Sequence, residues 1–237
     1  MHFPMFTVPV KDVLEMDMLR PHEELLHDDV LVEFDSSMGK AAFISHQWVS
    51  ALHPDPDLRQ FKHLQGVLKN ILTSSAKRID SLVMTELFAP FGWAKGIAAA
   101  DFRSRPLFIW YDYFSCPQID VLKWSMSDVQ KPLDRALQSI PAYISSCEFF
   151  FVLAPAVETR DQSELLGLST WASRGWCRFE KAVKELQPGK KCIVPWAEDV
   201  GMCRNRGTHS HQAVSVFFFF PGKTFLCLLL GGTMFTH

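Results

Sequence analysis

The sequence has no excess of positive charge and no closely spaced pair of cysteines. Its 24 Lys and Arg residues are slightly outnumbered by 26 Asp and Glu residues, so the chain lacks the basic field that draws proteins onto nucleic acid. The six cysteines lie far apart and form no CxxC pair, which is typical of free thiols in a reducing compartment. We therefore expect neither a nucleic-acid partner nor a disulfide framework.

The motifs of common metal and phosphate sites are missing too. There is no HExxH pattern, and "GWAKG" at 92–96 has neither the spacing nor the Lys-Ser/Thr ending of a P-loop. The "HSH" at 209–211 would bind a metal only adventitiously. The first residues lack the basic start and long apolar run of a secretory signal. We expect no metal, no bound cofactor and a cytoplasmic location.

Apolar residues, by contrast, are plentiful. They make up 48% of the chain, which is the composition of a globular protein. Four short apolar runs are unbroken rather than alternating, as in strands that are covered on both faces. These predicted strands are 41–45, 106–114, 148–155 and 190–196.

Helical patterns separate the predicted strands. Residues 55–72 repeat apolar side chains near the 3.6-residue period. In 128–147 we expect Pro141 to interrupt the pattern, so that Ser139 caps a short second helix. A further helix follows Arg174 and stops at Pro188-Gly189. Its apolar stripe, which we expect to face the core, is Trp176, Phe179, Val183 and Leu186.

The alternation of strands and helices predicts parallel pairing through right-handed crossovers, hence an α/β fold with a three-layer open parallel sheet. The length favours one domain with extensions. We assign residues 1–37 to a partly helical N-terminal extension, 38–206 to the α/β domain and 207–237 to an apolar C-terminal tail. Another helix is expected within 76–105.

The tail raises the question of a membrane span. Residues 213–235 are rich in Val, Phe and Leu, but Lys223 lies near the centre of this run. Pro221-Gly222-Lys223 cuts the run into two pieces that are too short to span a bilayer. We do not expect insertion into a membrane. Two alternatives stay open for the tail: association with a membrane, and an aberrant terminus that is prone to aggregation.

Three polar and aromatic clusters lie at or just beyond the carboxyl ends of the predicted strands. They are "SHQW" at 45–48, "YDYFSCPQ" at 111–118 and "RGWCRFE" at 174–180. In open α/β sheets ligands bind outside the carboxyl ends of the strands. We therefore expect the three clusters to meet at one rim.

These clusters, in this order, resemble the TIR-like superfamily, with a particular likeness to its heterokaryon-incompatibility-like branch. In TIR domains the first strand ends in a Phe-Ile-Ser type sequence, and the helix after the fourth family strand opens with Trp-Cys-x-x-Glu. Here Phe43-Ile44-Ser45 and the run from Trp176 to Glu180 match those motifs. The resemblance covers residues 38–196 and implies a flavodoxin-like fold.

In its catalytic members, the resemblance implies cleavage of NAD at the nicotinamide-ribose bond, with Glu180 as the essential carboxylate. NAD is then a substrate and not a cofactor. A carboxylate beside the ribose can stabilise the oxocarbenium-like charge of glycosidic cleavage, and nicotinamide leaves as a neutral group, so that one carboxylate can suffice. The residues alone also allow an ordinary ion pair between Glu180 and Lys184, four residues on.

Five further residues are candidate contacts for NAD. Ser45 and His46 follow the first strand, where the matching family loop borders the nucleotide, and would contact phosphate or ribose, while Trp48 would stack on a base. The alternatives are that Ser45 caps backbone groups and Trp48 fills the core. Asp112 would hold a ribose hydroxyl or cap a turn. Trp176 would wall the pocket or anchor its helix in the core.

Two other functions stay open. The same fold can serve as a non-catalytic module that self-associates in immune or self-recognition signalling. Because a TIR-like site often needs a neighbouring protomer, we expect a homo-oligomer in either case. A thiol hydrolase would use Cys177 or Cys116 with His46 as base, since a helix N-terminus favours the thiolate, but no oxyanion loop is recognisable for it.

Overall fold

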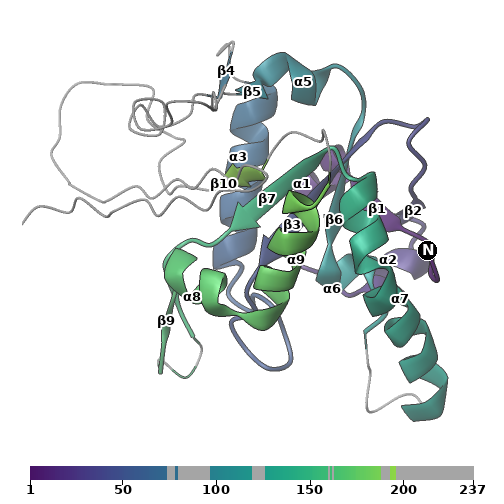
Figure 1. Ribbon diagram of the computed structural model, residues 1–237, viewed down its shortest axis with the longest axis vertical. Coiled ribbons are helices and arrows are strands. Elements are labelled where there is room, and N and C mark those ends of the chain that lie inside the picture. The colour runs from purple at the N-terminus through teal and green to yellow at the C-terminus, as the bar shows by residue number, and fades with distance from the viewer. Residues whose placement is uncertain are drawn as a thin grey trace, which may run out of the picture.

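The computed structural model describes residues 1–73, 78–79, 97–118, 126–159, 161, 163–187 and 193–195. Within these residues the centre of the fold is a six-stranded sheet with the order β10-β7-β3-β6-β1-β2 (Figure 1). Its strands are β1 (Phe6–Pro9), β2 (Val32–Glu33), β3 (Lys40–His46), β6 (Leu107–Tyr111), β7 (Phe149–Leu153) and β10 (Ile193–Pro195). The predicted α/β class is confirmed.

The four strands predicted from the apolar runs are β3, β6, β7 and β10, and they pair in parallel. Every residue of β6 and β7 is buried, because helices cover both faces of the sheet. The sheet as a whole is mixed and not purely parallel. The N-terminal segment, expected as a partly helical extension, adds β1 antiparallel to β6 and β2 antiparallel to β1.

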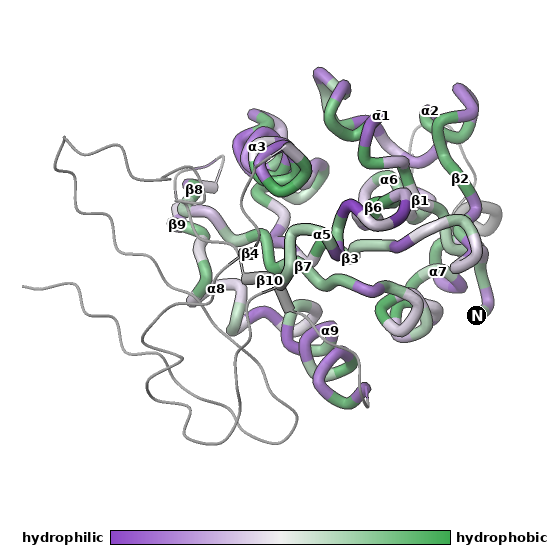
Figure 2. Tube along the Cα trace, turned by 90° about the horizontal axis from the view of Figure 1, so that it is seen from above, coloured by the Kyte–Doolittle hydropathy of each residue, from purple (hydrophilic) through white to green (hydrophobic). Residues whose placement is uncertain are grey.

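The helices lie on the two faces of the sheet, as the view in Figure 2 makes plain for α1, α2 and α3 on one side and α7 and α9 on the other. The first face carries α1 (Val10–Glu15), α2 (His22–His27), α3 (Arg59–Thr73), α5 (Ala99–Arg103) and α6 (Asp112–Ser115). The second carries α7 (Met126–Ser146), α8 (Leu168–Ser173) and α9 (Gly175–Glu185). Two small antiparallel pairs complete the described elements: β4 (Arg78–Ile79) with β5 (Ile97–Ala98), and β8 (Val157–Glu158) with β9 (Leu165–Leu166).

Successive residues of β3 serve the two cores in turn. Ala42 and Ile44 pack among the side chains of α3, whereas Phe43 points to the opposite face. There the Phe43 ring stacks on Trp110, with centroids 4.2 Å apart, and on Phe150, at 5.3 Å. This aromatic row joins three neighbouring strands and fixes the central part of the sheet.

The expectation that Pro141 divides its helix is wrong, because α7 continues through it to Ser146. Ser139 does not cap a second helix. Its hydroxyl donates to the carbonyl of Arg135, at 2.8 Å, and accepts the N–H groups of His2 and Phe3. Pro141 has no N–H group to bond to the carbonyl four residues earlier in the helix. The contacts with the N-terminal segment and the packing of the apolar face of α7 stabilise the helix despite this missing hydrogen bond.

The apolar stripe expected on the inner side of α9 is also wrong. Trp176 is 56% exposed, Phe179 43% and Leu186 82%, whereas Cys177 and Lys184 are buried. The inner side of this helix faces the polar rim of the sheet and accommodates Cys177, Glu180 and the ammonium group of Lys184, which donates to the carbonyl of Cys147 at 3.1 Å. Of the predicted stripe, Val183 alone packs against the core, and the three large apolar side chains are left on the outside.

Some expectations fall outside the described residues: the tail 207–237 with "HSH", and Cys192, Cys203 and Cys227. Most of the segment 76–105 does too, but its described part contains α5, so a helix in this segment is confirmed. In the part of the chain that is described, every helix is too short or too polar to cross a membrane.

Candidate functional site

The candidate site lies where β3 and β6 end and α9 passes beside them. Ser45 and His46 are the last two residues of β3, and Asp112 directly follows β6. Because the two strands are parallel neighbours, these side chains leave the sheet at the same edge. Glu180 reaches this edge from α9, so the three clusters predicted to share a rim do so.

The Ser45 hydroxyl connects this edge to both α8 and α9. It donates a hydrogen bond to Glu180 Oε2 at 2.5 Å and accepts one from the indole N–H of Trp171 at 3.0 Å. Ser45 and Trp171 are each 1% exposed. The hydroxyl is therefore occupied in both directions, which makes it a support for the Glu180 carboxyl.

The Glu180 carboxyl has lost much of its hydration. Burial raises its pKa from 4.5 to about 7, and the charge of Asp112 pushes in the same direction, while the hydrogen bond from Ser45 and the charge of His46 act against the rise. Near neutral pH this group is close to half protonated. A carboxyl with such a pKa can accept or donate a proton at neutral pH.

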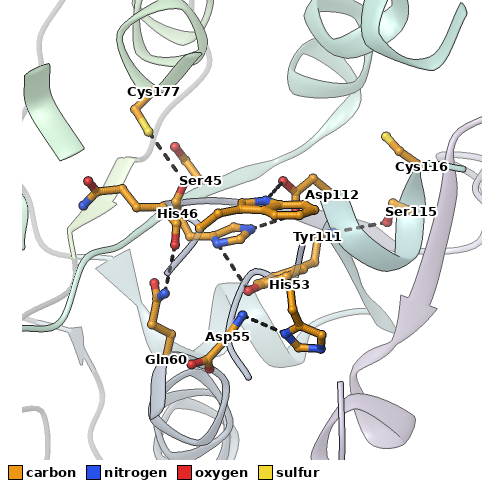
Figure 3. A network of polar contacts seen from close by, with 12 residues as sticks. Ser45, His46, His53, Asp55, Gln60, Tyr111, Asp112, Ser115, Cys116 and Cys177 are labelled. Atoms are coloured by element: carbon orange, nitrogen blue, oxygen red, sulfur yellow. Dashed lines mark hydrogen bonds and ion pairs between the residues drawn. The ribbon is translucent and has the colours of Figure 1, made fainter. Parts of the chain in front are cut away.

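A second cluster centres on Asp112 (Figure 3). Its Oδ1 lies 2.7 Å from His46 Nε2, and its Oδ2 accepts the indole N–H of Trp48 at 2.7 Å. The Tyr111 hydroxyl lies 3.3 Å from His46 Nδ1, and the two rings stack with centroids 4.1 Å apart. The His46 side chain is only 2% exposed, whereas that of Asp112 is 37% exposed. Asp112 is thus the outer end of a buried chain of polar groups.

The charges of this cluster support each other. Burial acts to lower the pKa of His46, but the charge and hydrogen bond of Asp112 outweigh it and raise the pKa overall. Burial acts to raise the pKa of Asp112, but the charge of His46 and the hydrogen bonds from His46 and Trp48 leave it lowered. The rim therefore holds two carboxyl groups with opposite tendencies: Asp112 is charged at neutral pH and Glu180 titrates there.

The loop after β3 is fixed from behind by residues that the sequence did not identify as part of the site. Asp55 accepts the backbone N–H of Arg59 at 3.0 Å and that of Phe61 at 2.7 Å, at the start of α3. Gln60 donates to the carbonyl of Gln47 at 2.9 Å. The one signal for these contacts in the sequence is the Asp55-Pro56-Asp57 run just before the helix, since Asp is a common N-terminal capping residue.

The connections of the sheet place a crevice at this edge. The chain passes from β3 to β6, its neighbour on one side. From β7, the neighbour of β3 on the other side, the chain passes in the opposite direction to β10. Ligands of open α/β sheets bind where two such connections diverge. A pocket of ≈ 510 Å³ lies here, between the loop after β3 and the segments after β7. It is lined by Trp48, Val49, Ser50, Ala51, Thr159, Asp161, Ser163 and Arg174.

Trp176 differs from the other candidates, because it is exposed on α9 and packs edge-on against Phe179 at 5.9 Å. Core anchoring is therefore wrong for this residue. In place of the ion pair with Lys184 that the residues alone also allowed, Glu180 bonds to Ser45, and Lys184 donates to the carbonyl of Cys147. Trp171, which carries no signal in the sequence, bonds to Ser45, and Arg174, the first residue of the 174–180 cluster, lines the pocket.

The two cysteines considered as nucleophiles, Cys177 and Cys116, lack the features of that role. The Cys177 thiol is buried beside the carbonyl of His46, at 3.6 Å, and burial raises its pKa to about 12. Burial also raises the pKa of Cys116 well above its ordinary value. The ring nitrogens of His46 lie against Asp112 and Tyr111 rather than against a thiol. The geometry does not favour a thiol hydrolase.

Comparisons with family models, with curated proteins and with solved structures find no match for this chain. Among the described residues there is no group of three or more His, Cys, Asp or Glu side chains arranged to hold a metal ion.

Proposed function

We propose that this protein is a TIR-like signalling domain that cleaves NAD at the nicotinamide-ribose bond, with Glu180 as its catalytic carboxylate. The observation that carries the proposal is the hydrogen bond of 2.5 Å from Ser45 to Glu180. It joins the two short motifs on which the TIR resemblance rests, although they lie 135 residues apart in the chain. The pair stands at the crevice where an open α/β sheet binds its ligands.

The strand order supports a flavodoxin-like fold. Across the sheet the parallel strands stand in the order β6-β3-β7-β10. When these four strands are numbered along the chain, this order is 2-1-3-4, which agrees with the flavodoxin-like order 2-1-3-4-5. In that order the ligand lies between the first and third strands, here β3 and β7. The ≈ 510 Å³ pocket lies beyond these two strands.

The two carboxyl groups suit the chemistry of an N-glycosidic bond. When the bond from ribose C1′ to the nicotinamide nitrogen breaks, the electron pair leaves with nicotinamide, which becomes neutral, and positive charge develops on the ribose. Asp112, which is charged at neutral pH, stabilises this charge from the rim. Glu180, with a pKa of about 7, accepts the proton of the water that adds to C1′.

The remaining side chains of the rim have supporting roles in this mechanism. Ser45 positions the Glu180 carboxyl, because its hydroxyl is already bonded to Glu180 and Trp171. His46 holds Asp112 in its charged form, and Trp48, which is tied to the same carboxylate, offers its ring to the ligand. We do not assign ligand contact to the exposed Trp176.

A non-catalytic assembly module is the second candidate, and the outer face of α9 favours it. Trp176, Phe179 and Leu186 are exposed there, and large exposed apolar side chains in proximity are typical of an association surface. The two functions are compatible, because self-association can complete a TIR-like site. The homo-oligomer remains part of the proposal.

Nicotinamide release from NAD, measured over a series of protein concentrations together with particle mass by light scattering, tests the proposal. An enzyme that depends on assembly releases nicotinamide with a specific activity that rises as the oligomer forms. If the protein associates but releases no nicotinamide at the highest concentration, the non-catalytic module is the function that is supported. No release and no association would remove both functions.

A further inference from the structure

Among the described residues that line the pocket beside the rim, one is cationic, and the mechanism above does not use it. Arg174 stands immediately before α9 and lines the pocket opposite the loop that follows β3. Its side chain is exposed, and among the described residues no carboxylate lies within ion-pair distance of it. A guanidinium in a pocket of this kind is available for a ligand anion, to which it can donate two parallel hydrogen bonds.

The helix behind Arg174 adds to the positive potential of the pocket. α9 has 11 residues, and no acidic residue occupies its first turn. Its N-terminal N–H groups and its dipole therefore favour an anion at the same end as the guanidinium. Glu180 lies six residues further along, which is about 9 Å of helix rise. The Glu180 carboxyl does not line this pocket but bonds to Ser45 at the adjoining rim, so a ligand of nucleotide size would have to extend from the pocket toward the rim to reach both groups.

Asp161 lines the same pocket from the turn between β8 and β9. Its Oδ1 accepts hydrogen bonds from Thr159 Oγ1 at 2.6 Å and from Ser163 Oγ at 2.8 Å. The bond from Thr159, followed by those from Ser163, lowers the pKa of Asp161 to about 2. This exposed carboxylate is charged throughout the neutral range and accepts hydroxyl hydrogen bonds, whereas it disfavours a phosphate placed directly against it, by an amount that solvent and salt reduce.

We propose that this pocket selects its nucleotide by charge, with Arg174 binding the diphosphate of NAD and Asp161 accepting the hydroxyls of an unphosphorylated ribose. Trp48, whose indole N–H is fixed by Asp112, lines the same pocket. A nucleotide that carries a further phosphate on that ribose is disfavoured by the Asp161 charge. The inference rests on the proposed function, because it names the groups of the substrate that the same site recognises.

Equilibrium binding measures this selection without turnover. The probes are ADP-ribose, ADP-ribose 2′-phosphate and adenosine, titrated by calorimetry into the full chain and into Arg174→Gln. Arg178→Gln is the matched control, since Arg178 is an exposed arginine one turn further along α9 that does not line the pocket. Circular dichroism establishes that each variant is folded.

We expect Arg174→Gln to weaken the binding of ADP-ribose about tenfold or more, as the loss of a charge-assisted contact does. The affinity for adenosine, which has no phosphate, stays within about twofold, as does the affinity of Arg178→Gln for ADP-ribose. In Asp161→Asn, the preference for ADP-ribose over its 2′-phosphate falls about tenfold. Equal losses in Arg174→Gln and Arg178→Gln, or no binding of ADP-ribose at millimolar concentration, would overturn the inference.

The outcomes separate this inference from the proposed function. Binding of ADP-ribose that depends on Arg174, without release of nicotinamide from NAD, supports the nucleotide pocket and removes the catalytic proposal. Release of nicotinamide with an unchanged KM for NAD in Arg174→Gln supports catalysis and overturns the role of Arg174.

Discussion

The Ser45 hydroxyl and the Glu180 carboxyl, 135 residues apart in the chain, lie 2.5 Å apart at the carboxyl edge of the sheet. The contact ties the end of a central strand to the middle of α9. Since Ser45 also accepts the Trp171 N–H at 3.0 Å, one hydroxyl positions the candidate carboxylate and satisfies a buried indole.

Ser45→Ala removes both of these hydrogen bonds. We expect a loss of about 1–3 kcal/mol in the free energy of unfolding, because the buried Trp171 N–H is left without its acceptor. We also expect the pKa of Glu180 to rise further, because the bond from Ser45 is what lowers it. Urea unfolding measures the first effect and the pH dependence of turnover the second.

Ser115→Ala is the matched control for Ser45→Ala. Ser115 is a buried hydroxyl at the same edge that accepts the backbone N–H of Tyr111 at 3.2 Å and does not touch Glu180. It should lower stability without moving the pH profile. A profile that shifts equally in both variants would contradict the positioning role of Ser45.

The raised pKa of Glu180 makes a prediction for stability. Between pH 4.5 and about 7 the folded state binds more protons than the unfolded state, so this group lowers stability progressively as pH rises across that window. Glu180→Gln removes the effect. We expect the variant to gain about 1–3 kcal/mol relative to the wild type at pH 8 and little at pH 4, a figure discounted for the partial exposure of the residue.

Unfolding curves at the two pH values measure this gain, with Glu185→Gln as control. Glu185 lies on the same helix and pairs with Lys181 at 3.8 Å. An equal change at pH 4 and pH 8 in Glu180→Gln would mean that the Glu180 carboxyl has an ordinary pKa.

Turnover itself should follow the same group. If the carboxylate form of Glu180 accepts the water proton, kcat/KM rises with pH along a slope of one and levels off above an apparent pKa of about 7. A bell centred below pH 5, or a profile flat from pH 5 to pH 8, would exclude Glu180 as the base.

Asp112→Asn should lower the pKa of His46, because the Asp112 charge and hydrogen bond are what raise it against burial. In the wild type this raised pKa contributes stability at pH values below the unfolded pKa, and the contribution is lost as pH rises through the folded pKa. NMR titration of the histidine ring protons measures the pKa, and urea unfolding curves over the same pH range measure the stability. The resonances of His53, whose Nδ1 accepts the N–H of Asp55, serve as the internal control, and an unmoved His46 would contradict the pairing.

The outer face of α9 can be tested apart from catalysis. Trp176→Ser, at a side chain that is 56% exposed, should leave stability nearly unchanged and weaken self-association. Met18→Ser, at a side chain that is 60% exposed elsewhere on the surface, is the control. If sedimentation gives the same association constant for both variants, α9 is not the association surface.

The sequence predicted the parts of this fold that depend on long apolar runs. The parallel strands β3, β6, β7 and β10 all coincide with such runs, because strands covered on both faces have to be apolar throughout. The meeting of Ser45, Asp112 and Glu180 at one edge followed from topology alone. The pairing of β1 and β2 was missed, since short antiparallel edge strands carry no comparable signal.

Two errors have the same physical origin: tertiary contacts outweigh local pattern. Pro141 does not end α7, because Ser139 and the N-terminal segment stabilise that helix from outside. The apolar stripe of α9 does not face inward, because the helix lies over a polar rim that binds Glu180 instead. Neither Ser139 nor Ser45 could be assigned its partner from periodicity, which describes one helix at a time.

The most direct measurement is nicotinamide release from NAD by the wild type, Glu180→Gln and Glu185→Gln at the same high protein concentration and at pH 7.5. The account predicts release by the wild type and by Glu185→Gln, and a loss of at least about 100-fold in Glu180→Gln with its fold intact. Release that is unchanged in Glu180→Gln would contradict the account, and so would its absence from the wild type at every concentration.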